Sequence, residues 1–385
     1  MGPLAGTKVI ELAGLGAAPY CCMMLADMGC EVIRIERNPP PPAIPDVLAR
    51  SRTSIALDLK SADGVEILFR LIGRSDVLIE GFRPGVMERA GIGPDTCLQH
   101  NPQLVYGRMT GWGQEGPLAR SAGHDLNYIA LAGALHPIGS IGGKPVPPLN
   151  MVGDFGGGLL LAFGIASALV ERQSSGKGQV VDAAMLDAAA SFMAMFQGTS
   201  GSTLFGEEPG AGLLAGAPHF YDTYATRDGK YISIAALEPQ FYQELIERLE
   251  LDGEQFSDHG FRGPGQKAQT SKWPELKEEL ASVFAQRTRD EWCDLLEGTD
   301  TCFAPVLKLS EANTHAHNRA RNTFTAVDGL NQQSPAPRFS RSLANDPVSS
   351  PAPGIDTHRV LHDLGYDTNE IEQLVVSAVV PPQGE

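Results

Sequence analysis

Residues 8–36, KVIELAGLGAAPYCCMMLADMGCEVIRIE, decide the fold, because they place an apolar strand, a glycine turn, a helix and a second apolar strand in direct succession. The same alternation continues with strand patterns over 54–60, 76–81 and 104–111 and a helical pattern over 62–72. Strands that alternate with helices in this way form parallel sheets with crossover helices on both faces. We therefore predict an α/β fold with a large, Rossmann-like parallel-sheet domain.

A second, smaller domain follows in the sequence. The stretch 220–237 predicts a hairpin with Asp228-Gly229 at its turn, and helical patterns follow over 239–251 and 273–296. The Pro-, Ser- and Asn-rich stretch 330–356 predicts a loop. The predicted limits are a large domain over 1–187, a linker over 188–217, a small α+β domain over 218–310, a linker over 311–330 and a C-terminal part over 331–385.

The composition excludes several classes of protein. The 385 residues carry 46 acidic and 30 basic side chains, a net charge of −16, which disfavours nucleic acids and anionic membranes as partners. The apolar run over 156–170 is shorter than the roughly 20 residues of a membrane span, so we predict a buried helix there. The six cysteines include no CxxC pair and no zinc-like spacing, so we expect no metal site, reduced thiols and a cytoplasmic protein.

The segment after the first strand matches a dinucleotide-binding fingerprint only in part. Gly14 and Gly16 form the turn, and Glu36 ends the second strand, as the fingerprint requires. The third fingerprint position is Pro19, where close packing of the helix on the strand needs Gly or Ala. We therefore interpret Pro19 as a helix-initiating residue and expect no nicotinamide cofactor here.

Basic residues follow several predicted strands. Ligands of parallel sheets bind at the carboxyl ends of the strands, and arginine forks suit phosphate oxygens. Residues 1–120 carry 12 basic and 13 acidic side chains, so this region is nearly neutral within an acidic chain. For any one of these cations, ordinary surface charge is the alternative. We predict that the region holds a ligand with several phosphates and an adenine through Arg34, Arg37, Lys60, Arg83 and Arg89.

Three polar residues in glycine-rich or apolar surroundings are candidates for catalysis. His124 lies in SAGHDLNYIALAG, Asp154 in NMVGDFGGG and Glu238 in ISIAALEPQFY. Each also has an ordinary structural explanation, as a core histidine, a helix-capping or turn-forming carboxylate and a helix-start acid respectively. Imidazole and carboxyl groups are the groups that general acid–base catalysis uses.

The motifs around these residues resemble those of the α-methylacyl-CoA racemases, which belong to the class III CoA-transferase family. The resemblance covers most of the chain and rests on GHDLNY (123–128), PLNMVGDFGGG (148–158), ERQSSGKGQVVDAAMLD (171–187) and FYDTY…YISIAALEPQFY (220–242). LADMGCEVIRIE, DVLIEGFRPGVMERAG and MTGWGQEGP are shared by the wider family and indicate the fold and CoA binding. The combination of His, Asp and Glu is the racemase-specific part.

The resemblance implies a large CoA-binding domain formed by both ends of the chain, a small domain between them and an interlocked homodimer. The active site would then lie between the large domain of one subunit and the small domain of the other. His124 and Asp154 would be the catalytic acid/base pair, and Glu238 would orient the histidine. The implied CoA-contacting positions are Arg37, Leu57, Asp58, Leu59, Lys60, Gly81, Phe82, Arg83, Arg89, Gly123, Asp125, Leu126, Asn127 and Tyr128.

The implied chemistry agrees with the residue types. Inverting the α-carbon of a 2-methyl-branched acyl-CoA requires one acid/base group on each face of that carbon. Neutral His124 can take the α-proton while protonated Asp154 delivers one, and Glu238 can stabilise the imidazolium that forms. Backbone N–H groups near Asp125 are candidates for the enolate oxygen. No cofactor is expected, because CoA enters as part of the substrate.

Two other functions remain as alternatives. In a class III CoA-transferase, Asp154 would be a nucleophile that forms a mixed anhydride with the acyl group. The presence of His124 and Glu238 favours racemisation, because anhydride transfer has no evident need for a histidine base. A non-catalytic acyl-CoA-binding protein is the second alternative, and it predicts that replacing His124 leaves function intact.

Overall fold

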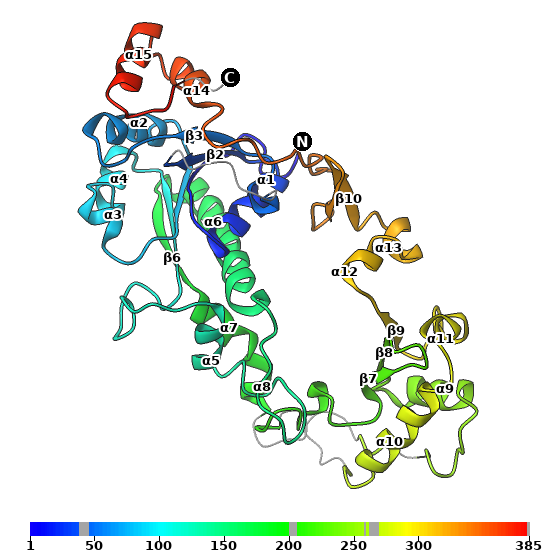
Figure 1. The fold of residues 1–385 in the computed structure, drawn as a ribbon. Coiled ribbons are helices and arrows are strands. Elements are labelled where there is room, and N and C mark those ends of the chain that lie inside the picture. Colours follow the sequence, from blue (N-terminus) through cyan, green and yellow to red (C-terminus); the bar gives the residue numbers. More distant parts are fainter. Residues whose placement is uncertain (38–45, 200–205, 258, 262–268, 383–385) are drawn as a thin grey trace. The chain divides into compact units, whose positions relative to one another are not determined.

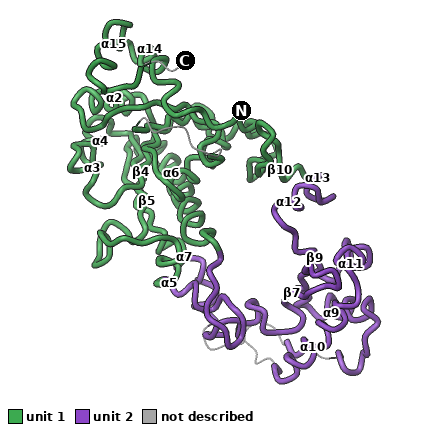
Figure 2. The backbone as a smooth tube through the Cα atoms, in the orientation of Figure 1, with its two compact units in different colours: residues 1–131, 149–189, 321–385 green, residues 132–148, 190–320 purple. Residues whose placement is uncertain are grey.

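The computed structural model describes residues 1–37, 46–199, 206–257, 259–261 and 269–382. Contacts divide the chain into two compact units (Figure 2). Residues 132–148 fall within the predicted large domain but cluster with unit 2, and the predicted linker over 311–330 is divided between the units. Unit 1 comprises residues 1–131, 149–189 and 321–385, and unit 2 comprises residues 132–148 and 190–320.

Unit 1 is built on a six-stranded parallel sheet, which confirms the predicted α/β fold. The strand order is β3-β2-β1-β4-β5-β6. The chain adds β2 and β3 on one side of β1 and then β4, β5 and β6 on its other side, so the order of strands reverses between β1 and β4. Ligands of doubly wound sheets bind at the carboxyl ends of the strands, near such a reversal. The strands are β1 (Lys8–Leu12), β2 (Glu31–Glu36), β3 (Thr53–Ala56), β4 (Val77–Glu80), β5 (Val105–Thr110) and β6 (Gln179–Ala184).

Helices lie on both faces of this sheet (Figure 1), and an apolar layer packs between each set of helices and the sheet. In β1, Val9 packs in one layer and its neighbour Ile10 in the other, because alternate side chains of a strand point to opposite faces. The layer around Val9 contains α1 (Ala17–Asp27) and α6 (Gly156–Ser175). The layer around Ile10 contains α2 (Ala62–Ile72), α3 (Val86–Arg89), α4 (Pro94–His100), α14 (Thr357–Asp363) and α15 (Thr368–Val376).

Helix α6 is longer than the apolar run from which it was predicted. Together with the turn before it, it spans Met151–Ser175, which is long and apolar enough to cross a membrane by length and composition alone. Its face with Leu161 and Ile165 is buried against the sheet and α1, as in the core helix of a folded domain. Its opposite face leaves Phe163 and Val170 exposed.

The segment predicted as a loop over 330–356 begins with a strand, so that prediction is wrong for its first residues. Strands β10 (Phe324–Val327) and β11 (Leu330–Gln333) form an antiparallel hairpin. The overlooked signal is the pair Asp328-Gly329, whose φ angles of 48° and 77° are the left-handed backbone that a tight hairpin turn requires.

Buried ion pairs hold several arginines of unit 1. Arg34 is 9% exposed and pairs with Glu11 and Glu36. The structure therefore contradicts the prediction that Arg34 is free to bind phosphate. Arg50 is fully buried and pairs with Asp27 at 2.6 Å. Such arginines keep their partners, because breaking a buried pair leaves a charge uncompensated and costs about 3–5 kcal/mol.

Unit 2 contains a three-stranded antiparallel sheet in the order β7-β8-β9. The predicted hairpin is confirmed, and Gly229 in its turn has a φ of 70°. The strands are β7 (Tyr221–Ala225), β8 (Tyr231–Ala235) and β9 (Phe303–Val306), and the larger helices are α9 (Pro239–Arg248), α10 (Trp273–Phe284) and α11 (Arg289–Leu296). Shorter helices are α8 (Ala194–Gly198), α12 (Leu309–Ala312) and α13 (Ala316–Ala320), and α7 (Met185–Phe192) crosses the limit between the two units.

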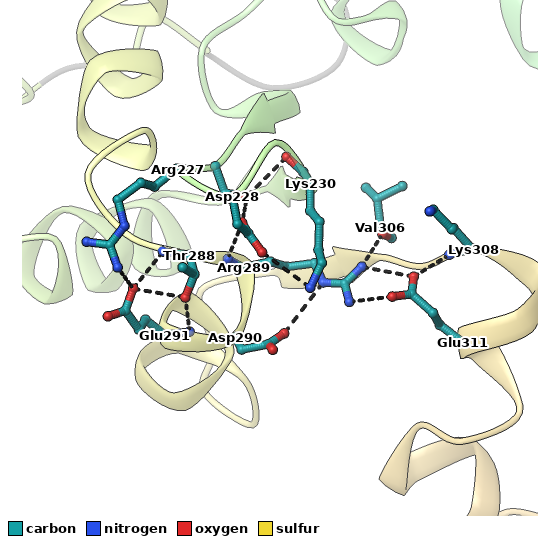
Figure 3. A network of polar contacts seen from close by, with 11 residues as sticks. Arg227, Asp228, Lys230, Thr288, Arg289, Asp290, Glu291, Val306, Lys308 and Glu311 are labelled. Carbon is teal, nitrogen blue, oxygen red and sulfur yellow. Dashed lines mark hydrogen bonds and ion pairs between the residues drawn. The ribbon is translucent and has the colours of Figure 1, made fainter.

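A polar network joins α11 to the chain that follows β9 (Figure 3). Arg289 donates from both terminal nitrogens to Glu311, at 3.1 and 2.9 Å. This paired contact lowers the pKa of Glu311 to about 2, so the carboxylate stays charged. At the start of α11, Thr288 and Glu291 form a reciprocal capping box, which fixes the direction of the helix.

The stability of unit 2 should fall as the pH is lowered, because of His219. This fully buried histidine bonds through Nε2 to the Tyr242 hydroxyl, and burial is the main cause that lowers its pKa to about 3. The unfolded chain binds a proton on this histidine below about pH 6.5, whereas the folded chain does so only near pH 3. The free energy of unfolding is therefore unaffected by this group at neutral pH and falls as the pH is lowered below about 6.5.

From about pH 7.5 to about pH 5, we expect a loss of about 2 kcal/mol from this group. Urea unfolding followed by the fluorescence of the buried Trp273 and Trp292 at the two pH values measures it. The His219→Gln variant serves as the comparison, since it cannot titrate. An equal pH dependence in both proteins would contradict the prediction.

Candidate active site

Helix α5 (Asp125–Leu131) begins directly after His124. The main-chain N–H of His124 donates to Asn127 Oδ1 at 3.1 Å, and the N–H of Asn127 donates to the carbonyl of His124 at 2.8 Å. This reciprocal pair fixes the first turn of the helix and therefore the position of His124. The imidazole itself is exposed, so it is open to a substrate.

Asp154 lies in a single turn of π-helix, Met151–Phe155, which leads into α6. π-Helical turns are rare in proteins, and a large share of those that do occur lie at functional sites. Asn150 Nδ2 donates to Asp154 Oδ2 at 3.0 Å. Burial is the main cause that raises the pKa of Asp154 above its usual value; the bond from Asn150 opposes this, and the nearby carboxylate of Asp125 adds to it. A raised pKa favours the protonated form, which a proton donor must have.

One carboxylate connects the two candidate residues. Asp125 is 5% exposed, and its Oδ2 accepts the N–H groups of Gly153 at 2.6 Å and of Asp154 at 2.8 Å. Asp125 also follows His124 directly in the chain. The structure therefore brings the segments of His124 and Asp154 together, although they are far apart in the sequence. A positive charge on His124 acts to lower the pKa of Asp154, against the larger effect of burial.

A pocket of about 210 Å³ lies beside His124, where β4 and β5 end. Gly81, Phe82 and Arg83 line it after β4, and Tyr128 lines it from α5. These residues are among the predicted CoA-contacting positions, and the structure places them at the edge of the sheet where ligands of this fold bind.

The first turn of α5 is packed against the segment that follows β5. The ring of Trp112 meets the ring of Tyr128 edge-on at 4.7 Å, and the Tyr128 hydroxyl donates to the carbonyl of Gly123. A Cβ atom at Gly111 would lie 2.1 Å from the Tyr128 ring, so only glycine allows this approach. Sequence reasoning did not select Trp112, although it stands in the quoted motif MTGWGQEGP.

A buried ion pair behind the pocket was also missed. Glu80, at the end of β4, is fully buried and accepts from Arg108 Nε at 2.9 Å. Its second oxygen accepts the N–H of Phe82 at 2.7 Å, so the pair holds the turn that carries Phe82 and Arg83. Glu80 and Arg108 stand in the apolar strand patterns 76–81 and 104–111, where a charged residue is itself a signal of pairing.

The remaining predicted CoA-contacting positions differ in accessibility. Leu57 is 2% exposed and its side chain packs in the core, so the side chain is not available to a ligand. Asp58 Oδ1 accepts the N–H of Lys60 at 3.0 Å, and Leu59 is partly buried. The exposed positions are Arg37 after β2, Asp58 and Lys60 after β3, Arg89 in α3, and Leu126 and Asn127 in α5.

Glu238 belongs to unit 2, whereas His124 and Asp154 belong to unit 1. It is exposed and precedes α9, where its side chain makes no capping hydrogen bond. Its position at the start of α9 agrees with the ordinary explanation as a helix-start acid, although its side chain does not cap the helix. The pairing of Glu238 with His124 stays a prediction.

Comparisons with known proteins show the family of the chain. The chain is 43% identical to the α-methylacyl-CoA racemase of Mus musculus over 98% of its own length and 97% of the relative. It is 41% identical to the α-methylacyl-CoA racemase of Homo sapiens, over 96% of each chain. Among solved structures, a CAIB/BAIF family protein from Brucella suis matches with a TM-score of 0.79 and 27% identity, covering 94% of this chain and 99% of that one. The profile of CoA-transferase family III matches residues 4–359, and the chain belongs to that family.

Proposed function

We propose that this protein is a racemase that interconverts the (R) and (S) forms of 2-methylacyl-CoA thioesters. The observation that carries the proposal is that Asp125, the residue after His124, accepts the backbone N–H of Asp154 with its buried carboxylate. This contact joins the segments of the two candidate residues, and His124 lines a pocket at the carboxyl edge of the sheet. The identity to two α-methylacyl-CoA racemases over nearly the whole chain supports it.

Each residue has a defined task in the proposed reaction. From one enantiomer, neutral His124 takes the α-proton, the electron pair of the C–H bond enters the enolate, and Asp154 delivers its proton to the opposite face. The reverse reaction starts from imidazolium and aspartate. The raised pKa of Asp154 supports its role as the donor, since more of it is protonated near neutral pH.

The proposal includes a second subunit and no cofactor. We propose an interlocked homodimer in which Glu238 of one chain orients and stabilises His124 of the other, as the family resemblance implies. Proton transfer between carbon and these side chains needs neither a metal nor a redox group. The net charge of −16 supports a protein without nucleic-acid or anionic-membrane partners, and the cysteine pattern supports a cytoplasmic one.

CoA transfer is the alternative for the same site, with Asp154 as the nucleophile. It differs in needing a free acid as acceptor, and it leaves His124 without a task. His124 is exposed, and Asp125 joins its segment to the turn of Asp154, which favours racemisation.

Incubation with a single enantiomer of a 2-methylacyl-CoA in D₂O tests the proposal. We expect the α-proton NMR signal to disappear and the chirality to invert with no acceptor acid present. Absence of exchange and inversion, together with acyl transfer once a free acid is added, would establish the transferase instead.

A further inference from the structure

Asp125 makes contacts that its sequence position does not explain. A helix-start carboxylate ordinarily caps its own helix, yet Asp125 Oδ2 accepts from Gly153 and Asp154, which belong to a different element. Its other oxygen, Oδ1, is buried and has no hydrogen-bond partner among the described residues. The carboxylate is therefore oriented by these two backbone N–H groups.

We propose that Asp125 is a positioning residue, whose carboxylate holds the π-helical turn of Asp154 against the start of α5 and so sets the spacing between Asp154 and His124. This inference rests on the proposed function, because spacing matters only if both groups act on one carbon. Racemisation needs the two groups on opposite faces of that carbon at one fixed separation, and displacements of about 1 Å can cost about 10²-fold in rate.

The packing around the turn supports this role. A Cβ atom at Gly153 would lie 2.6 Å from Asp125 Oδ2, so the close approach of the two segments requires glycine there. On the other side, a Cβ atom at Gly16 would lie 3.0 Å from Asp154 Oδ2. Asp154 thus lies between the start of α1 and Asp125, and glycine at position 16 leaves the room that its carboxylate occupies.

The charge of Asp125 has a second effect at the same place. The carboxylate has one oxygen without a partner, and its negative charge lies beside Asp154, where it favours the protonated form of Asp154. Geometry and charge can be separated by substitution. Asn at position 125 keeps an oxygen that can accept both N–H groups, whereas Ala removes the acceptor and leaves two buried donors unpaired.

Each single enantiomer of a 2-methylacyl-CoA in D₂O provides the measurement, with inversion and α-exchange followed separately by chiral analysis and NMR. In Asp125→Ala, we expect inversion to fall about 10²-fold. Exchange with retention should persist for the enantiomer whose proton faces His124, because the histidine alone can remove and return a proton. Asp125→Asn should recover inversion to within about tenfold of the wild-type rate, because one acceptor oxygen remains.

Gly153→Ala tests the same contact with Asp125 still present. We expect the same selective loss of inversion, and the double variant should be no worse than Asp125→Ala, since both changes break one contact. Asp367→Ala is the matched control: Asp367 also accepts a backbone N–H, that of Glu370 at 2.9 Å, but at the start of α15. Removal of the Asp367 carboxylate should leave the ratio of α-exchange to inversion the same as in the wild type.

The possible outcomes separate the two proposals. A wild-type protein that neither exchanges nor inverts overturns the proposed function and this inference with it. If the wild type inverts its substrate, the inference alone is overturned by undiminished inversion in Asp125→Ala, by equal losses of exchange and inversion, or by an Asn variant as impaired as the Ala variant.

Discussion

His124→Ala should lose inversion of both enantiomers by about 10³-fold or more, since a positioned general base contributes about 10²–10⁴-fold. Deprotonation from the face of His124 stops because the imidazole is removed. Inversion of the other enantiomer stops as well. Asp154 can still remove its α-proton, but no group remains on the His124 face to deliver a proton. The enantiomer whose α-proton faces Asp154 should still exchange with solvent, since that carboxylate is intact. Chirality and deuterium content of each enantiomer in D₂O are the quantities to follow.

His317→Ala is the control for this substitution, because His317 is an exposed histidine on α13 in unit 2. Its activity should match the wild type. A His124→Ala protein that inverts substrate at the wild-type rate would exclude the two-base mechanism. If the wild type and His124→Ala both bind the CoA thioester and neither catalyses exchange or inversion, the acyl-CoA-binding alternative is favoured instead.

Asp154→Asn should also lose inversion by about 10³-fold, because an amide of the same size neither donates nor accepts a proton at the required pKa. Exchange with retention should survive for the enantiomer that faces His124. The two variants at the site therefore predict opposite patterns, each keeping exchange from one face only. That pattern identifies which group serves which face of the carbon.

Asp95→Asn controls for the loss of one carboxylate, since Asp95 is exposed in the first turn of α4. The transferase alternative also predicts an inactive Asp154→Asn, but no exchange from either face. It further predicts a covalent acyl adduct on Asp154 that hydroxylamine captures in the wild-type protein. Detection of that adduct during turnover, without α-exchange, would contradict the racemase proposal.

The local patterns were sufficient for most secondary structure. The helix predicted over 62–72 is α2 (Ala62–Ile72), and the Asp228-Gly229 turn lies between β7 and β8. Both follow from interactions between neighbours in the sequence: apolar periodicity in the helix and left-handed backbone in the turn. The hairpin at Asp328-Gly329 carried the same signal and was overlooked within a stretch rich in Pro and Ser.

Charged and apolar residues near the site were less predictable. Arg34 and Arg37 stand in one short motif, yet Arg34 is enclosed by Glu11 and Glu36 while Arg37 is exposed. Leu57 and Lys60 likewise share a motif, but Leu57 packs in the core. Strand register and neighbouring strands decide these outcomes, because they determine which side chains face an acidic partner, the core or solvent.

The sequence by itself determined the alternation of strands and helices and the choice of imidazole and carboxyl groups, since both are properties of local residue patterns. Only the tertiary structure decided that Asp125 joins the turn of Asp154 to the helix that follows His124. Side-chain contacts between distant segments depend on how the sheet and its helices pack, which no local pattern encodes. The spacing of the candidate catalytic residues is therefore a property of the fold as a whole.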